Sequence, residues 1–166
     1  GTAFVSMPQN DPTLWALDTY NSGLQALDAQ QMELAQQRLD LAYAYSPLNA
    51  EINFAEGNLH LALRETDTAK SYYFSALHLD PEHVGTYNNL GVLALKESRW
   101  ELATRFFLHA LEHAPNNAKL YFLLAQAQLK SGERAAARRS IERAVELDPA
   151  RPEFRTLQHD LAESSH

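Results

Sequence analysis

The sequence has no cysteine among its 166 residues and no long apolar run. The first absence excludes a disulfide framework, a thiolate metal site and a cysteine nucleophile, and it is compatible with either a cytoplasmic or a bacterial periplasmic location. No apolar stretch approaches the ~18 residues that a membrane-crossing helix needs, so we expect no direct membrane insertion of this chain. Residues 1–12 also lack the basic and apolar regions of a signal peptide.

Glycine and, in the first half, basic residues are also scarce. The six glycines are scattered, which excludes a glycine-rich phosphate loop. Residues 1–81 carry three basic and ten acidic side chains, whereas residues 82–166 carry eleven of each. An acidic surface repels nucleic acid and anionic lipid, so we expect no nucleic-acid partner.

The most informative feature present is a repeat of 34 residues. Proline lacks an amide hydrogen and clashes inside a helix, so regularly spaced prolines mark the ends of repeated helical units. The prolines with this spacing are Pro47, Pro81, Pro115 and Pro149. A column of small residues has the same spacing: Gly23, Gly57, Gly91 and Ala125. A column of large residues completes the pattern: Leu39, Tyr73, Phe107 and Ile141. Small residues beside large ones are typical of two closely packed helices.

The third unit carries a family resemblance, and its defining residues are Tyr87, Leu90, Gly91, Ala103, Phe107, Ala110 and Pro115. This pattern resembles the tetratricopeptide (TPR) repeat. The second unit departs from it, with Asn53 and Glu56 where Trp and Leu are expected, and the first has Thr19 and Ser22 there. The resemblance implies an all-α fold, a right-handed superhelix of four helix-turn-helix units plus a capping helix.

The resemblance and the helix signals together predict the domain organisation. A flexible segment 1–10 precedes a single TPR domain over residues 11–163. The predicted units are 16–49, 50–83, 84–117 and 118–149, followed by a capping helix over 150–163. Three Asp-Pro pairs, beginning at Asp11, Asp80 and Asp148, are interpreted as helix starts, and Gly132 is expected to close a helix.

In the TPR family, the first helix of each pair lines a concave groove that holds a peptide or a helix. This implies a set of ligand-binding residues on the first helices: Tyr20, Asn21, Phe54, Asn58, Asn88, Asn89, Lys119, Phe122 and Gln126. Aromatic rings offer apolar area, and amides can pair with both backbone groups of a peptide. Alternatively, some rings pack between units. Replacing Asn58 and Asn89 by Ala is expected to leave folding intact.

Some TPR domains clamp the C-terminal carboxylate of a partner with two Asn and several basic residues. Asn58, Asn89 and Lys119 match three of those five positions, but Phe54 and Leu123 occupy the other two. A buried carboxylate needs charge-assisted partners, so we do not expect this clamp here.

Chemistry-bearing clusters are few. His109 and His113 lie four residues apart near Glu112, a spacing that could hold a metal, but the interpretation favoured is structural, with His113 half-buried. Four arginines between 134 and 143 alternate with glutamates, which favours a solvated face with ion pairs over a docking patch for an acidic partner. We therefore predict no catalytic residue, no metal site and no cofactor, and the chain is not expected to be an enzyme.

The function predicted is a protein–protein interaction scaffold. It would bind a peptide or helix of a partner protein in its concave groove, as part of a larger or multiprotein assembly. The alternative is a structural spacer or oligomerisation array within a larger protein, for example a glycosyltransferase or a pilus or secretion assembly factor. Oligomerisation stays open under both hypotheses.

Overall fold

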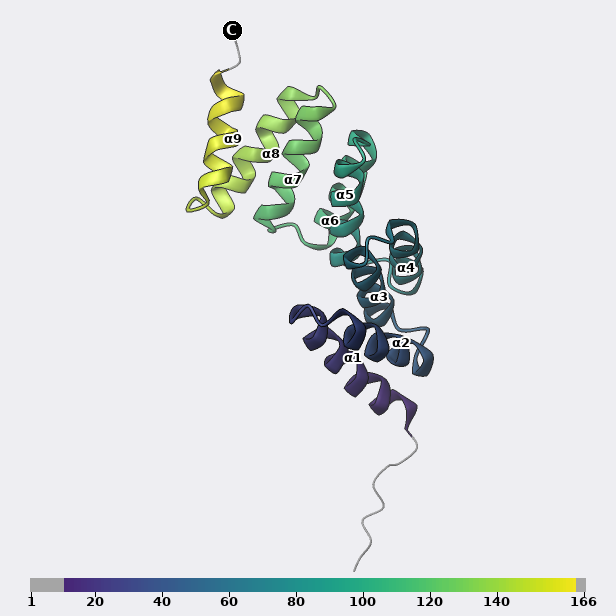
Figure 1. The fold of residues 1–166 in the computed structure, drawn as a ribbon. Coiled ribbons are helices and arrows are strands. Elements are labelled where there is room, and N and C mark those ends of the chain that lie inside the picture. The colour runs from purple at the N-terminus through teal and green to yellow at the C-terminus, as the bar shows by residue number, and fades with distance from the viewer. Residues whose placement is uncertain (1–10, 164–166) are drawn as a thin grey trace, which may run out of the picture. The chain divides into compact units, whose positions relative to one another are not determined.

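The structure is a computed structural model that describes residues 11–163, and it confirms the all-α prediction. The predicted flexible segment 1–10 lies outside the described residues. Within them the chain forms nine helices and no strand (Figure 1). The helices are α1 (Pro12–Asp28), α2 (Met32–Tyr45), α3 (Ala50–Ala62), α4 (Thr66–Leu79), α5 (Val84–Lys96), α6 (Trp100–His113), α7 (Ala118–Lys130), α8 (Arg134–Leu147) and α9 (Pro152–Glu163). None of these helices is long and apolar enough to cross a membrane.

The helices pack as successive pairs, and the two repeating columns form the contact inside each pair. A Cβ atom on Gly91 of α5 would lie 2.5 Å from the Phe107 ring of α6. On Gly23 of α1 it would lie 2.6 Å from the Leu39 side chain of α2. Real Cβ contacts are longer than this, so only glycine lets the two backbones approach so closely.

Each first helix ends in the same left-handed turn. The residue with positive φ recurs every 34 positions, and its φ values are 57° at Gln30, 63° at Arg64, 58° at Ser98 and 86° at Gly132. In the third turn the amide of Ser98 donates to Leu95 O, and the next amide, of Arg99, donates to Ala94 O. These two bonds define a Schellman motif. The prediction that Gly132 closes a helix is therefore confirmed, but the other three turns use residues that sequence alone does not single out.

The helix starts follow a different rule from the one predicted. Asp11 caps α1 as expected, accepting a hydrogen bond from the Thr13 amide at 3.0 Å. Asp80, however, is the C-terminal cap of α4, and α5 begins only at Val84, capped by His83. The residue before a proline is driven into an extended conformation, so Asp80 with ψ 92° ends one helix rather than starting the next. Asp148 likewise closes α8, and α9 begins at Pro152.

The chain divides into two compact units, Gly1–Pro81 and Glu82–His166, which we call the N-terminal and C-terminal units. In the N-terminal unit the core gathers around Leu39, Leu59 and Tyr73, all fully buried. In the C-terminal unit two clusters form the core, one around Phe107 and Leu124 and one around Ile141, Phe154 and Leu161.

The last helix, α9, closes the C-terminal unit. It buries Phe154 and Leu161 against α7 and α8 and keeps its remaining side chains largely toward solvent. Arg134 Nη2 and Arg138 Nε of α8 each donate a hydrogen bond to Leu161 O at 3.0 Å. Two of the four clustered arginines therefore stabilise the C-terminal end of α9, where a helix leaves carbonyl groups unpaired and a cation is favourable.

Candidate functional site

Two of the predicted groove residues lie on α1. Tyr20 is half-buried and packs against the core of the N-terminal unit. Burial, and secondarily the nearby charge of Glu51, raises the pKa of its phenol. Asn21, one residue further on, is exposed and accessible to a ligand.

Phe54 and Asn58 lie on α3, and both are half-buried. The Phe54 ring centroid lies 5.9 Å from that of Tyr73. The Tyr73 hydroxyl donates a hydrogen bond of 2.6 Å to Asn58 Oδ1. Because Tyr73 is fully buried, removing the Asn58 amide would disturb the hydrogen bonding of a buried hydroxyl. This geometry argues against the expectation that Asn58→Ala leaves folding intact, and we now expect that variant to lose stability.

In the C-terminal unit the predicted residues lie on α5 and α7. Asn88 and Asn89 are half-buried, and the Asn88 amide donates to Asn89 Oδ1 at 3.1 Å. Lys119 is exposed and Gln126 is half-buried. The Phe122 ring centroid lies 5.0 Å from that of Phe154, so this ring packs against α9.

All nine predicted groove residues thus lie on the first helix of a helix pair, and two of them, Asn21 and Lys119, are exposed. The three aromatic residues each pack partly on the core of the N-terminal or the C-terminal unit. A single groove formed by the nine residues stays a prediction.

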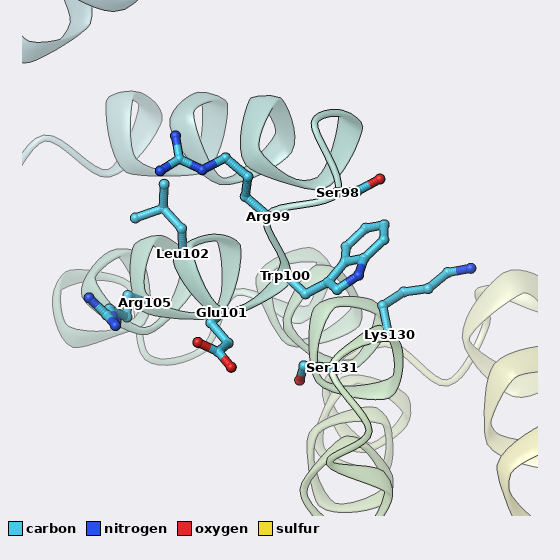
Figure 2. Close-up of a pocket in the computed structure, with 8 residues that line it drawn as sticks. All are labelled: Ser98, Arg99, Trp100, Glu101, Leu102, Arg105, Lys130 and Ser131. Atoms are coloured by element: carbon cyan, nitrogen blue, oxygen red, sulfur yellow. The ribbon is translucent and has the colours of Figure 1, made fainter.

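A surface hollow of about 590 Å³ lies in the C-terminal unit, where the α5–α6 turn meets the end of α7. Figure 2 shows Trp100 beside Lys130, whereas the side chains of Arg99 and Arg105 extend to the opposite side of the hollow, near Leu102. The Lys130 ammonium lies 5.8 Å from the Trp100 ring centroid, a cation–π distance. The hollow combines both charge signs with one aromatic ring, which suits a polar peptide segment.

The two histidines of α6 do not form a metal site with each other. His109 Nδ1 lies 3.7 Å from Glu112 Oε2, and its ring stacks on Tyr87. His113 is exposed, so the expectation that packing half-buries it is wrong. The neighbouring Ala114 packs against the core at this end of α6 instead. Burying the polar imidazole of His113 there would not lower the free energy of the folded chain.

A cluster that the sequence analysis missed lies inside the N-terminal unit. Asp40 of α2 and Glu56 and His60 of α3 bring one potential metal ligand atom each within 4.8 Å of one another. Glu56 is fully buried, and its Oε2 lies 3.5 Å from His60 Nε2. The other ring nitrogen of His60, Nδ1, lies 3.2 Å from Glu65 Oε2.

The surroundings of this cluster penalise negative charge. Burial, followed by the adjacent carboxylate of Asp40, raises the pKa of Glu56 to about 8. Tyr72 of α4 stacks on His60 with ring centroids 5.3 Å apart. Burial raises the pKa of Tyr72 as well, and the charges of Glu56, Tyr43 and Asp40 add to the effect.

One signal in the sequence could have revealed the cluster. Glu56 stands in a column whose other members, Ser22, Leu90 and Leu124, carry no charge. A carboxylate placed at a core position of one repeat only is unfavourable unless something compensates for it. Glu56 departs visibly from the TPR pattern, but the sequence alone does not place Asp40 or His60 beside it.

Comparison with known proteins agrees with the fold. PilF of Pseudomonas aeruginosa is 22% identical with a TM-score of 0.83, covering 92% of this chain and 69% of its own. MamA (41-end) from Desulfovibrio magneticus RS-1 is 21% identical with a TM-score of 0.77, covering 90% of each chain. The APC/C hetero-tetramer Cut9–Hcn1 is 18% identical with a TM-score of 0.78, covering 88% of this chain and 30% of that one. At these identities the likeness concerns the fold alone. No curated protein matches the sequence significantly.

Two family models match the sequence, and both are described as tetratricopeptide repeat. One matches residues 54–118 and the other residues 94–161, so together they span well over half of the 166 residues. They cover the close contacts Gly57–Tyr73 and Gly91–Phe107, whereas the similar contact Gly23–Leu39 lies outside the matched residues. The chain belongs to the tetratricopeptide repeat family of helical protein-interaction scaffolds.

Proposed function

We propose that this chain binds an extended peptide or a helix of a partner protein through the first helices of its repeats. The observation that supports the proposal is that amide, aromatic and cationic side chains lie on the first helices of the pairs, on α1 and α3 in the N-terminal unit and on α5 and α7 in the C-terminal unit; we call these side chains the first-helix set. Amides can pair with a peptide backbone, and partly buried rings offer a fixed apolar surface at little entropic cost. TPR arrays are typically non-enzymatic scaffolds, and Cut9–Hcn1, one structure of similar fold, is a protein complex.

The exposed members of the first-helix set allow a direct test. A peptide selected from a displayed library against the full chain supplies the probe, and its dissociation constant is measured for each variant. We expect Lys119→Ala to weaken binding at least about threefold, since it removes an exposed cation from the first-helix set. The matched control is Arg139→Ala, which removes an equally exposed cation from a second helix, α8.

Asn21→Ala on α1 and Gln37→Ala on α2 form the corresponding pair in the N-terminal unit, since both residues are exposed. The proposal requires the first-helix variant of a pair to lose affinity and the second-helix variant to keep it. If both first-helix variants bind as tightly as the wild type, the ligand does not use the first helices.

A second candidate function is self-association, and a specific observation favours it. α1 exposes Leu14, Trp15 and Leu17, which is a large apolar area for one helix end. Light scattering on the full chain tests this function. A dimer that Leu17→Glu converts to monomer would support it, and a monomer at the highest soluble concentration would eliminate it.

A further inference from the structure

The N-terminal unit contains a buried carboxylate without a hydrogen-bond donor. Both oxygens of Glu56 are inaccessible to solvent, and neither accepts a hydrogen bond from an N–H or O–H group of the described residues. The groups nearest to it are a second carboxylate, Asp40, and the imidazole of His60. Two carboxylates and an imidazole at this separation can be satisfied together only by a shared proton or by a cation.

The distances within the cluster fit a single metal ion. In a tetrahedral zinc site, with bonds of about 2.0–2.1 Å, neighbouring ligand atoms lie about 3.4 Å apart. His60 Nε2 and Glu56 Oε2 are 3.5 Å apart, which is too long for a good hydrogen bond and suitable for two ligands of one ion. The Asp40 oxygen lies within 4.8 Å of both, so a small rotation of this exposed side chain completes the set.

The histidine is also held as a metal ligand is. Metal-binding imidazoles usually donate their second N–H to a carboxylate, which fixes the tautomer and leaves the other nitrogen free to coordinate. Glu65 Oε2 lies 3.2 Å from Nδ1 of His60, and Tyr72 stacks on the ring. His60 is thus oriented with Nε2 toward the carboxylate of Glu56, which has no hydrogen-bond partner in the described residues.

We propose that Asp40, Glu56 and His60 bind one divalent transition-metal ion of the Zn²⁺ type, with Glu65 as the positioning residue of His60. An imidazole with two carboxylates favours zinc and its neighbours over Mg²⁺ and Ca²⁺, which prefer oxygen ligands alone. Asp40 lies at the surface, so solvent can supply the remaining ligand. The net negative charge of residues 1–81 attracts the cation further. The proposed metal site lies in the N-terminal unit, and metal binding there does not depend on the peptide binding proposed above.

Titration calorimetry of the chelator-treated full chain with ZnCl2 tests the proposal. We expect one Zn²⁺ per chain, and at least about tenfold weaker binding for Asp40→Asn, Glu56→Gln and His60→Gln. The matched control is His109→Gln, which disrupts another helical His–Glu pair and should leave the affinity unchanged. Circular dichroism confirms that each variant is folded, and Asp40→Asn is the mildest change because its side chain is exposed.

A second readout separates these ligands from other histidines. Co²⁺ bound in place of Zn²⁺ gives visible absorption bands, which should disappear in His60→Gln and persist in His109→Gln. Glu65→Gln should bind Zn²⁺ about tenfold more weakly while keeping the one-to-one stoichiometry. The proposal is overturned if the wild type binds no Zn²⁺, if it binds Mg²⁺ equally well, or if Asp40→Asn and His60→Gln both bind as tightly as the wild type.

Discussion

At the scale of single residues, Glu56 is the feature with the largest chemical consequence. Its carboxyl group is held in the core beside Asp40, and the pKa rises from 4.5 to about 8. The folded chain therefore retains a proton that the unfolded chain releases above about pH 4.5. Asp40, His60 and Tyr72 are titratable groups close to it, and Tyr43 in turn lies close to Tyr72.

The first prediction concerns this proton. In the metal-free protein, the contribution of Glu56 to the free energy of unfolding should be largest below about pH 4.5. It should then fall as pH rises toward 8, by at most about 1.4 kcal/mol per pH unit. Denaturant titrations at pH 5, 6, 7 and 8 measure the slope. Glu56→Gln cannot ionise at this position, so it should make the dependence of the unfolding free energy on pH less steep. If the variant shows the same slope as the wild type, the buried carboxyl group does not cause the pH dependence.

At the scale of helix pairs, stability depends on how closely the two backbones approach. Gly91 faces the Phe107 ring, whereas the fourth unit places Ala125 in the same column as Gly91 and Ile141 in that of Phe107. A methyl group is therefore accommodated opposite the β-branched Ile141, whereas Leu39, Tyr73 and Phe107 each face a glycine.

The second prediction follows from this difference. Gly91→Ala should lower the free energy of unfolding by about 1–3 kcal/mol, because the new methyl group overlaps the Phe107 ring. Combining it with Phe107→Ile recreates the pairing of the fourth unit and should recover part of the loss. A double-mutant cycle from denaturant unfolding gives the coupling energy. Strictly additive losses would mean that the two side chains do not meet.

The third prediction concerns the left-handed turns. Ser98 adopts φ 58°, a conformation that costs a non-glycine residue energy, so Ser98→Gly should stabilise the chain by about 0.5–1 kcal/mol. Gly132→Ala should destabilise it by a similar amount, and only through the backbone, because no atom lies within 4 Å of the added Cβ. Thermal unfolding of both variants tests the pair, and shifts of the same sign would contradict it.

The sequence predicted the helix pairs well because proline, glycine and large side chains recur at a fixed spacing. It could not indicate the turns at Gln30, Arg64 and Ser98, since the hydrogen bonds of the Schellman motif impose a conformation that these residues do not prefer. The bond from Tyr73 to Asn58 was equally hidden, because it joins residues on two different helices. The Asp40–Glu56–His60 cluster depends on α2 meeting α3, so only Glu56, at its unusual position, gave a sign of it.

At the scale of the whole molecule, the two units differ in how completely they bury their apolar residues. Of the eight large hydrophobic side chains exposed in the described residues, seven belong to the N-terminal unit and one, Leu108, to the C-terminal unit. The C-terminal unit ends in α9, which covers its core. The net negative charge is also confined to residues 1–81.

The fourth prediction compares the units as separate fragments. Residues 82–166 should fold alone with a cooperative thermal transition, since terminal repeats need a polar outer face and α9 provides one. Residues 1–81 should melt at a lower temperature, and added salt should raise that temperature by screening the repulsion among acidic side chains. Circular dichroism melts at low and high salt measure both effects. A more stable N-terminal fragment would contradict the prediction.

The left-handed turns offer a further use. Their residues Gln30 and Ser98 are exposed, and each lies in the turn between two helices. Since the natural sequence lacks thiols, Gln30→Cys and Ser98→Cys would each introduce one unique attachment point for a spin label or dye, one in each unit. In a chain labelled at both points, spectroscopy would measure the distance between the two labels. A change in this distance on addition of Zn²⁺ or a peptide would then be detected directly.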